Sequence, residues 1–240
     1  MERSDFEDGR EIAGMTTFAA FGLEEDGLVL IPGTEYRVRQ GALAPFLELS
    51  EKAKSAGYEL RVESAYRSFD RQLSIWNRKA TGKLKLLDAN GAPFKELPKD
   101  EEVLMRSILL WSALPGGSRH HFGTELDVVD GKSVPEGYEV ELTEQECDGM
   151  FAPFHKWLSE QIETQNSCGF ERVFVSGRGK IQPERWHISH RPSAFELEKL
   201  FDPKALRKVY EKADLELKSA ILDNFDELMR DYVYPYFVEK

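Results

Sequence analysis

A histidine pair followed by an aspartate is the first feature of this sequence that could do chemistry. The stretch SRHHFGTELDVVD, residues 118–130, contains the adjacent His120 and His121 and then, six residues after the second of them, Asp127. A catalytic zinc ion needs three protein ligands with nitrogen or oxygen donors and one position left for water. This stretch could supply two of the three. Spacing alone is equally consistent with histidines that are solvated or satisfied within the core.

A second stretch, PERWHISH at residues 183–190, could complete such a site. In an extended chain His187 and His190 lie on opposite faces, so at most one of them faces a shared site. Glu184 lies three residues before His187. That position is close enough to reach a water molecule at a metal ion without being a ligand.

The segment TELDVVD, which contains Asp127, is predicted to be a strand because polar and apolar residues alternate along it. In such a strand Glu125 and Asp127 share one face, and Leu126 and Val128 share the other. Asp127 can therefore point into a cleft while the two apolar side chains enter the core. Gly123 allows the chain to bend sharply just before this strand.

Helices and short strands are interleaved along the rest of the chain. Apolar periodicity predicts helices over residues 41–56, 69–80, 101–114 and 150–166 and almost throughout the chain beyond Pro192, and short strands over 58–64, 124–130, 171–175 and 186–190. Ser68 is expected to cap the second helix. Because the helices do not follow a regular βαβ repeat, we expect an α+β fold: a small, mainly antiparallel sheet with flanking helices around a cleft.

The chain is expected to have three parts. These are an acidic N-terminal arm over residues 1–25, a main domain over 26–192, and a helical C-terminal extension over 193–240 that packs on this domain. Hydrophobic residues make up 41% of the 240 residues, which is ample material for a core. A dimer contact is the alternative role for the extension.

Charge and composition exclude several classes of protein. The formal net charge of −11 argues against a nucleic-acid partner. No stretch approaches the roughly 20 apolar residues of a membrane span. Two cysteines, Cys147 and Cys168, are too few for a disulfide scaffold. The acidic opening does not have the pattern of a secretory signal, so we expect a cytoplasmic protein, or an exported one if a leader has been removed.

Three segments, in this order, resemble the signature of the zinc D-Ala-D-Ala metallopeptidases. They are Ser64-Ala-Tyr66-Arg67-Ser68 with Gln72, then Ser118-x-His120-x-x-Gly123-x-x-x-Asp127, and last Glu184-x-Trp186-His187. This family includes the D,D-carboxypeptidases and dipeptidases of vancomycin resistance. It shares its fold with lysostaphin-type peptidases and the hedgehog signalling domain. The resemblance covers roughly residues 60 to 190.

The resemblance implies one zinc ion per chain, bound by His120, Asp127 and His187. His121 is then not a direct ligand. When bound, zinc lowers the pKa of its water to about 7, so that hydroxide is available at neutral pH.

The same resemblance implies roles for the polar residues around the metal. Glu184 is expected to be the general base, and Arg67 to bind and polarise the substrate. Gln72 and Ser118 are expected to add polar contacts to the substrate. Glu125 departs from the pattern, because the family usually has a small residue there. It is expected either at a solvated rim or in contact with a cationic part of the substrate.

The implied reaction is hydrolysis of the bond before the C-terminal D-alanine of peptidoglycan stem peptides or muropeptides. The resemblance alone favours D,D-carboxypeptidase activity. In the cytoplasm, however, that activity would trim the cell's own wall precursors, so the expected location slightly favours an L,D-carboxypeptidase that acts on recycled tetrapeptides. A D,D-dipeptidase, a cell-wall endopeptidase and a non-enzymatic zinc-dependent binding module are the alternatives. The presence of both Glu184 and Arg67 favours an enzyme.

Overall fold

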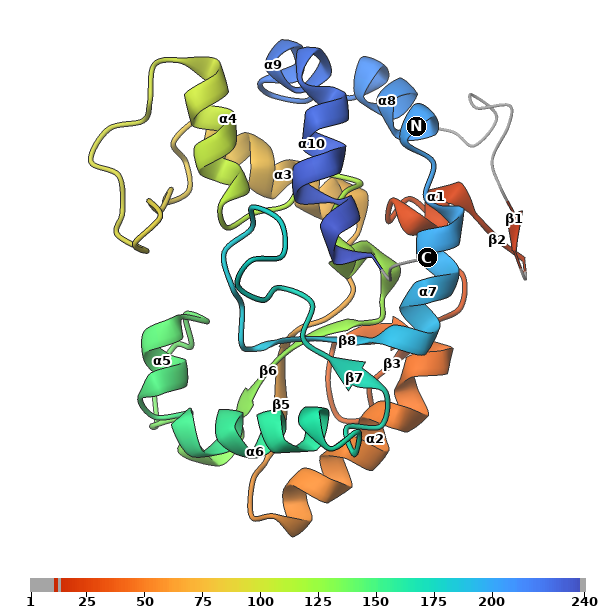
Figure 1. Ribbon diagram of the computed structural model, residues 1–240, viewed down its shortest axis with the longest axis vertical. Coiled ribbons are helices and arrows are strands. Elements are labelled where there is room, and N and C mark those ends of the chain that lie inside the picture. The colour runs from red at the N-terminus through yellow and green to blue at the C-terminus, as the bar shows by residue number, and fades with distance from the viewer. Residues whose placement is uncertain (1–10, 13, 238–240) are drawn as a thin grey trace.

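A four-stranded antiparallel sheet lies at the centre of the computed structural model, which describes residues 11, 12 and 14–237 (Figure 1). Its strands, in spatial order, are β5 Leu60–Ser64, β6 Glu125–Asp130, β8 His187–His190 and β7 Phe170–Glu171. All three pairings are antiparallel. Two small antiparallel pairs lie outside this sheet: β1 Glu11–Ile12 with β2 Met15–Thr16, and β3 Leu28–Leu30 with β4 Arg37–Arg39. The expected α+β fold with a small antiparallel sheet is confirmed.

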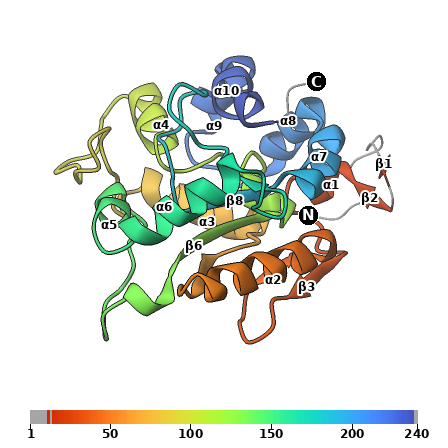
Figure 2. The same cartoon turned by 60° about the horizontal axis from the view of Figure 1, so that its bottom comes forward.

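Two helices pack beside the sheet to form one hydrophobic core. These helices are α2 Gln40–Ser55 and α6 Ala152–Glu163. Figure 2, which brings this part of the molecule forward, shows both of them next to β6. Leu126 and Val128 of β6 are fully buried in this core, as the alternation of the strand predicts.

A second hydrophobic core joins the N-terminal and C-terminal helices. It contains side chains from α1 Thr17–Ala20, α3 Phe69–Ala80, α4 Glu101–Leu109, α7 Arg191–Leu200, α8 Pro203–Lys212, α9 Lys218–Asp223, α10 Phe225–Tyr232 and the 3-10 turn η4 Tyr234–Tyr236. The C-terminal helices lie above the sheet in Figure 1, on the side away from α2 and α6. The extension is thus a large part of this core. The short helix α5 Glu144–Asp148 and the turns η2 Arg119–Phe122 and η3 Gly131–Ser133 complete the described elements.

Three expectations about elements are wrong in part. The helix expected over 101–114 ends at Leu109. The segment Phe18–Phe21 was expected within an arm, but its side chains are buried in the second core. Residues 1–10 and 13 lie outside the described residues. The strand expected over 171–175 is limited to β7, because Val173 and Phe174 leave the sheet and enter the second core.

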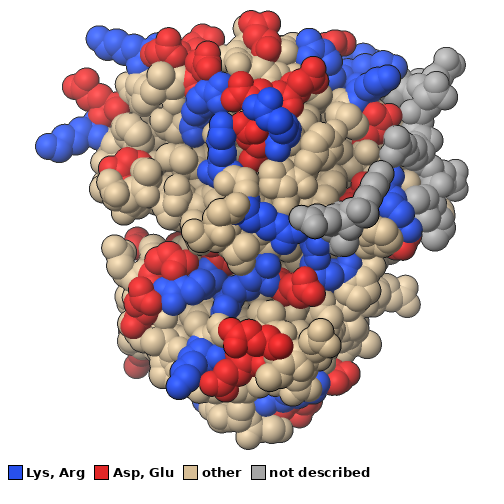
Figure 3. All heavy atoms as spheres, in the orientation of Figure 1, with Lys and Arg blue, Asp and Glu red and all other residues tan. Residues whose placement is uncertain are grey.

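The N-cap of α3 follows the sequence prediction. The Ser68 hydroxyl accepts a hydrogen bond from the Arg71 N–H at 3.3 Å. This cap fixes the start of α3 directly after Arg67. No helix among the described residues is long and apolar enough to cross a membrane. Acidic and basic side chains are interspersed on the face shown in Figure 3.

Candidate metal centre and cleft

The register of the sheet brings the two sequence stretches together. Asp127 in β6 pairs directly with His187 in β8. The turn η2, which carries His120, is separated from β6 only by Gly123, with φ +70°, and Thr124. A larger residue in place of Gly123 would have a strained backbone conformation, and its Cβ atom would lie 2.6 Å from Leu28 Cδ2, so it would also have to displace the Leu28 side chain.

His120, Asp127 and His187 form a cluster that could bind one metal ion. One donor atom from each residue can be chosen so that all three lie within 4.8 Å of one another. The Nδ1 atom of His120 lies 2.7 Å from the Ala65 carbonyl oxygen and donates to it. The other ring nitrogen, Nε2, then carries the lone pair, and it lies 3.3 Å from Asp127 Oδ2.

The ring nitrogen of His187 that points away from the cluster is bound by Glu125. The Nε2 atom of His187 lies 2.9 Å from Glu125 Oε2, and its Nδ1 lies 3.0 Å from Asp127 Oδ1. Because Nε2 donates to Glu125, Nδ1 is the atom directed at the cluster. Two imidazole nitrogens and one carboxylate are a suitable donor set for catalytic zinc, so the residues present fit this metal.

The charges of the cluster favour a cation. Burial alone would raise the pKa of Asp127, but the protonated His187, whose Nδ1 lies 3.0 Å from Oδ1, holds it well below its usual range, so the carboxylate is ionised. Burial also lowers the pKa of His120, which keeps that ligand neutral. Burial opposes a charge on His187 as well, yet Asp127 and Glu125 raise its pKa to about 9. Metal binding at Nδ1 would therefore release a proton from His187.

The other two histidines of the stretches are structural. His121 donates from Nδ1 to the Arg67 carbonyl oxygen at 2.6 Å, and its Nε2 accepts from the Gly116 N–H at 2.9 Å. Both ring nitrogens are therefore engaged, which leaves none for a metal. His190 contacts the Ser193 hydroxyl through Nδ1 at 2.9 Å.

A cavity of about 250 Å³ opens beside the cluster. Its polar lining includes Arg67, Lys79, Ser118, His120, Asp127 and Glu184, and its apolar lining includes Leu87, Trp111, Phe174, Ile181 and Trp186. Some of these residues come from the segment that precedes α4 and others from the segment between β7 and β8. The indentation at the left edge of Figure 3 lies between the halves of the molecule that carry α4 and α5.

Glu184 lies in this lining, with Oε2 3.9 Å from His187 Nδ1. Burial raises the pKa of Glu184 to about 7, while the nearby cations Arg67 and Lys79 oppose the rise. A carboxyl group that titrates near neutral pH can both accept and return a proton. Glu184 thus lies in the cavity beside the three candidate ligands.

Arg67 and Gln72 have different positions in the cleft. The Arg67 guanidinium donates to Gln72 Oε1 at 2.9 Å and to the Ser64 hydroxyl at 3.3 Å, and Arg67 lines the cavity. Gln72 is fully buried, and its Nε2 donates to the Ala113 carbonyl oxygen at 2.7 Å. The expected contact of Gln72 with substrate is therefore wrong, because one end of its amide holds Arg67 and the other is bound to Ala113. Ser118 lies in the lining, as its expected role requires.

Lys79 is a cleft residue that the sequence analysis missed. Its Nζ donates to the Ser112 hydroxyl at 2.5 Å, and no ion pair joins it to any other described residue. Burial, followed by the charge of Arg67, lowers the pKa of Lys79 to about 8. A signal was present in the sequence. Lys79 follows Gln72 by seven residues and so lies on the same face of α3.

Glu125 does not have the position that the sequence analysis expected. It shares a face of β6 with Asp127, but its side chain is fully buried. Its partners are His187, Arg119, Ser189 and Thr124. It is therefore neither a rim carboxylate nor a substrate contact. Arg119, which the sequence analysis also missed, is the cation that compensates its charge.

Comparisons with known proteins agree with this geometry. Residues 35–193 match the sequence profile of VanY, described as D-alanyl-D-alanine carboxypeptidase. An uncharacterized protein of Haemophilus influenzae is 26% identical over 124 residues, which are 50% of this chain and 92% of that protein.

Two solved structures are similar in fold. The LdcB LD-carboxypeptidase superposes with a TM-score of 0.51 and 21% identity, over 92% of this chain and 96% of that one. VanYB in complex with D-Ala-D-Ala has a TM-score of 0.49 and 17% identity, over 79% of this chain and 91% of that one. The likeness to LdcB shows a shared fold.

Proposed function

The chain belongs to the VanY family of D-alanyl-D-alanine carboxypeptidases, and from this premise we propose that it removes the C-terminal D-alanine from peptidoglycan stem peptides. One observation carries the proposal. Two members of a zinc-type ligand set (His120 and Asp127), the largely buried acid Glu184 and two cations line a single cavity of about 250 Å³. The third ligand, His187, contacts Asp127 at 3.0 Å. This volume is near the lower end for small-ligand sites and suits the end of a short peptide.

In the proposed mechanism, Glu184 moves the proton. His120, Asp127 and His187 would hold the zinc ion, which would supply Lewis-acid chemistry and lower the pKa of an attacking water. The Glu184 carboxylate accepts a proton from this water and delivers it to the leaving amine of D-alanine. In the metal-free protein burial raises the pKa of Glu184 to about 7, and a carboxyl group whose pKa is raised in this way can return a proton more readily than an exposed one.

Arg67 and Lys79 can interact with the negative charges of the substrate. Arg67 is held by Gln72 and Ser64 and can stabilise negative charge that develops on the scissile carbonyl oxygen. Lys79 is half-buried without an ion-pair partner among the described residues, and the cost of removing an ammonium from water falls when it is paired with an anion. The free carboxylate of a terminal D-alanine is such a partner. We assign Lys79 to it, which makes a carboxypeptidase a better fit than an endopeptidase.

We propose the D-Ala-D-Ala end of pentapeptides as the preferred substrate. The description of the matched family supports it. The expected cytoplasmic location slightly favoured L,D cleavage of tetrapeptides, and a contact of Glu125 with a cationic part of the substrate would have supported this reaction. Glu125 is buried against His187 instead, so this support for the L,D reaction is lost.

The test compares defined stem peptides on one zinc-loaded preparation, with products identified by mass spectrometry. Because specificity is a ratio of kcat/KM values, tetrapeptide and pentapeptide must be measured side by side. We expect faster release of D-alanine from the pentapeptide and little from a pentapeptide with a C-terminal amide. Faster release from the tetrapeptide would assign an L,D-carboxypeptidase, and release of the dipeptide D-Ala-D-Ala a dipeptidase. No product from either peptide would contradict the proposal.

A further inference from the structure

We infer that Glu125 and Arg119 form a buried positioning relay that fixes the His187 ring and ties it to the C-terminal turn Tyr234–Tyr236. The inference rests on the proposed function, because it concerns His187 as a zinc ligand. It goes beyond that function because it makes the C-terminal extension part of the metal site. Neither Glu125 nor Arg119 lines the cavity, so both act through His187 and not on the substrate.

Glu125 divides its two carboxylate oxygens between different partners. Oε2 accepts from His187 Nε2 at 2.9 Å. Oε1 accepts from the hydroxyls of Ser189 at 2.8 Å and Thr124 at 3.0 Å and from Arg119 Nη2 at 3.0 Å. One oxygen therefore orients the imidazole while the other is anchored to the protein. A glutamine could keep only one of these two functions, because its amide nitrogen cannot accept a hydrogen bond.

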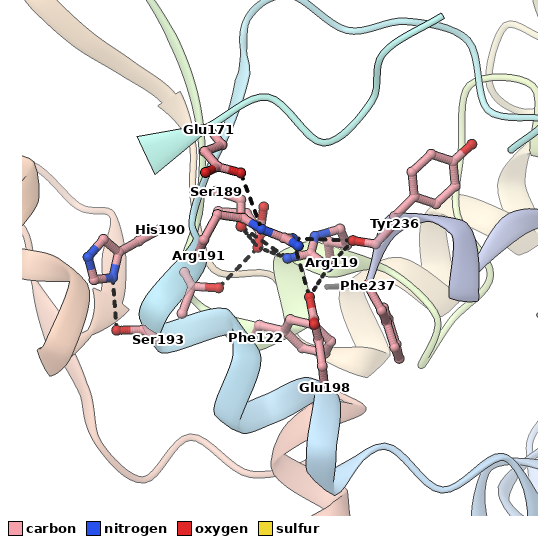
Figure 4. A network of polar contacts seen from close by, with 12 residues as sticks. Arg119, Phe122, Glu171, Ser189, His190, Arg191, Ser193, Glu198, Tyr236 and Phe237 are labelled. Carbon is pink, nitrogen blue, oxygen red and sulfur yellow. Dashed lines mark hydrogen bonds and ion pairs between the residues drawn. The ribbon is translucent and has the colours of Figure 1, made fainter. Parts of the chain in front are cut away.

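Arg119 connects this carboxylate to the C-terminal part of the chain. Figure 4 shows Arg119 with its partners Ser189, Glu198 and Tyr236. Its Nη1 donates to Glu198 Oε1 in α7 and to the Tyr236 carbonyl oxygen, each at 2.7 Å. Its Nη2 donates to Glu125 and to the Ser189 hydroxyl, which in turn donates to Glu125. The planar guanidinium thus reaches η2, β6, β8, α7 and η4 at once, as a fork of fixed geometry can.

Aromatic side chains form a second, apolar connection between His187 and the C-terminal turn. The ring of Tyr236 lies 4.7 Å from the ring of Phe174, and Phe174 lies 4.6 Å from the imidazole of His187. Tyr236 is almost fully buried, and its hydroxyl accepts from the Ile181 N–H at 2.8 Å. The C-terminal turn therefore contacts the His187 environment through the polar relay and through Phe174.

A positioning role explains why charges are buried at this point. Burying an ion pair contributes little net stability compared with apolar residues of the same size. A carboxylate that accepts from the distal nitrogen of a ligating histidine, by contrast, fixes its tautomer and its orientation. The resemblance pattern has a small residue at position 125, so this orienting acid is a particular feature of this chain.

The experiment measures zinc affinity, and for this reason it does not depend on which substrate is cleaved. Glu125→Gln and Arg119→Met should each weaken zinc binding about 10- to 100-fold, measured by competition with a chelator. The visible spectrum of the cobalt-substituted protein should change in both. In the metal-free protein, the ring ¹⁵N shifts of His187 should move in Glu125→Gln. Arg119→Lys keeps the positive charge but loses the planar guanidinium that binds several partners at once. It replaces Arg119→Met as the test variant if Arg119→Met does not fold.

Arg178→Met is the matched control. Arg178 also binds carbonyl oxygens of the C-terminal segment, those of Pro235 at 2.7 Å and Phe237 at 3.1 Å, and none of its hydrogen bonds is to Glu125 or His187. It should lower stability without changing zinc affinity or the cobalt spectrum. Unchanged zinc affinity in folded Glu125→Gln, or an equal loss in Arg178→Met, would overturn the relay. If wild type binds zinc but cleaves no stem peptide, the proposed function fails while the relay stands.

Discussion

At the residue scale, each polar side chain of the site is oriented by a second contact. The Ala65 carbonyl orients His120, Glu125 orients His187, and Gln72 holds Arg67. Catalytic groups must be held within a fraction of an ångström of their working geometry, so these contacts matter as much as the groups themselves. The arrangement separates residues that act on the substrate from residues that position them.

Glu184→Gln is expected to keep zinc and lose activity. The amide has nearly the same shape but cannot take a proton, and removal of a general base typically costs about 10²- to 10⁴-fold in kcat. Metal content and turnover should be measured on the same preparation. Near-normal turnover by a zinc-replete variant would remove Glu184 from the mechanism.

Lys79 should make substrate binding depend on pH. Its pKa is lowered to about 8, so the ammonium is charged below that pH and neutral above it. KM for a peptide with a free carboxylate should therefore rise as the pH increases through about 8. Lys79→Arg should abolish this rise, since a guanidinium stays charged.

Lys79→Met should raise KM even at neutral pH. Loss of a hydrogen bond to a charged group costs about 1.5–3 kcal/mol, which corresponds to roughly 10- to 100-fold. A substrate with a C-terminal amide is the control, and its weak binding should be insensitive to either substitution. If both substrates respond equally to Lys79→Met, Lys79 does not bind the carboxylate.

At the element scale, the junction between η2 and β6 decides whether His120 and Asp127 can meet. Gly123 forms this junction in a left-handed conformation, and Arg39 donates from Nε to the neighbouring Phe122 carbonyl oxygen at 3.0 Å. The backbone N–H of Arg39 also donates to the Gly123 carbonyl oxygen at 2.7 Å. The turn is therefore fixed against β4 before β6 begins.

Gly123→Ala should destabilise the protein and weaken zinc binding together. An alanine with positive φ costs about 1–2 kcal/mol, and forcing its Cβ against Leu28 adds about 1–3 kcal/mol. Gly91→Ala is the matched control, because Gly91 has φ +78° and open space around its Cα. Urea unfolding of the metal-free proteins measures the loss of stability in the two variants. Equal losses of stability would show that only the backbone conformation matters at Gly123.

At the scale of the whole molecule, the metal site lies where the two hydrophobic cores meet. Leu126 and Ile188, which flank the ligand pair on β6 and β8, belong to the first core. Phe122 and Phe174 belong to the second. A metal ion held at this junction would therefore link the two parts of the fold, and its binding free energy would add to the stability of both.

Zinc removal should lower the melting temperature of the whole protein. Free zinc at 100 times its Kd stabilises the folded state by about 2.7 kcal/mol. For a domain of this size that corresponds to roughly 5–10 °C. Calorimetry with and without a chelator measures the shift. His120→Ala should abolish it, whereas His121→Ala should lower stability but keep the shift, and the reverse result would contradict the ligand assignment.

Local sequence pattern determined much of the fold and part of the site. Ser68 before an amphipathic run determined the start of α3, and alternation determined which side of β6 enters the core. Three short motifs identified the family, since the ligand types and their order along the chain are themselves sequence properties. Periodicity was less reliable at residues 171–175, where packing of Val173 and Phe174 outweighed strand propensity.

Only the tertiary structure decided the surroundings of these residues. Alternation placed Glu125 and Asp127 on one face, but the pairing of β6 with β8 decided that Glu125 meets Ser189 and the far side of His187. Lys79 and Arg119 carried no motif, and their roles arise from contacts with groups that are distant in the chain: Glu198 is 79 residues from Arg119, and Tyr236 is 117. The physical reason is that local periodicity fixes which way a side chain points along its own element. Its partners, and hence its burial and charge state, depend on how elements remote in sequence pack against each other.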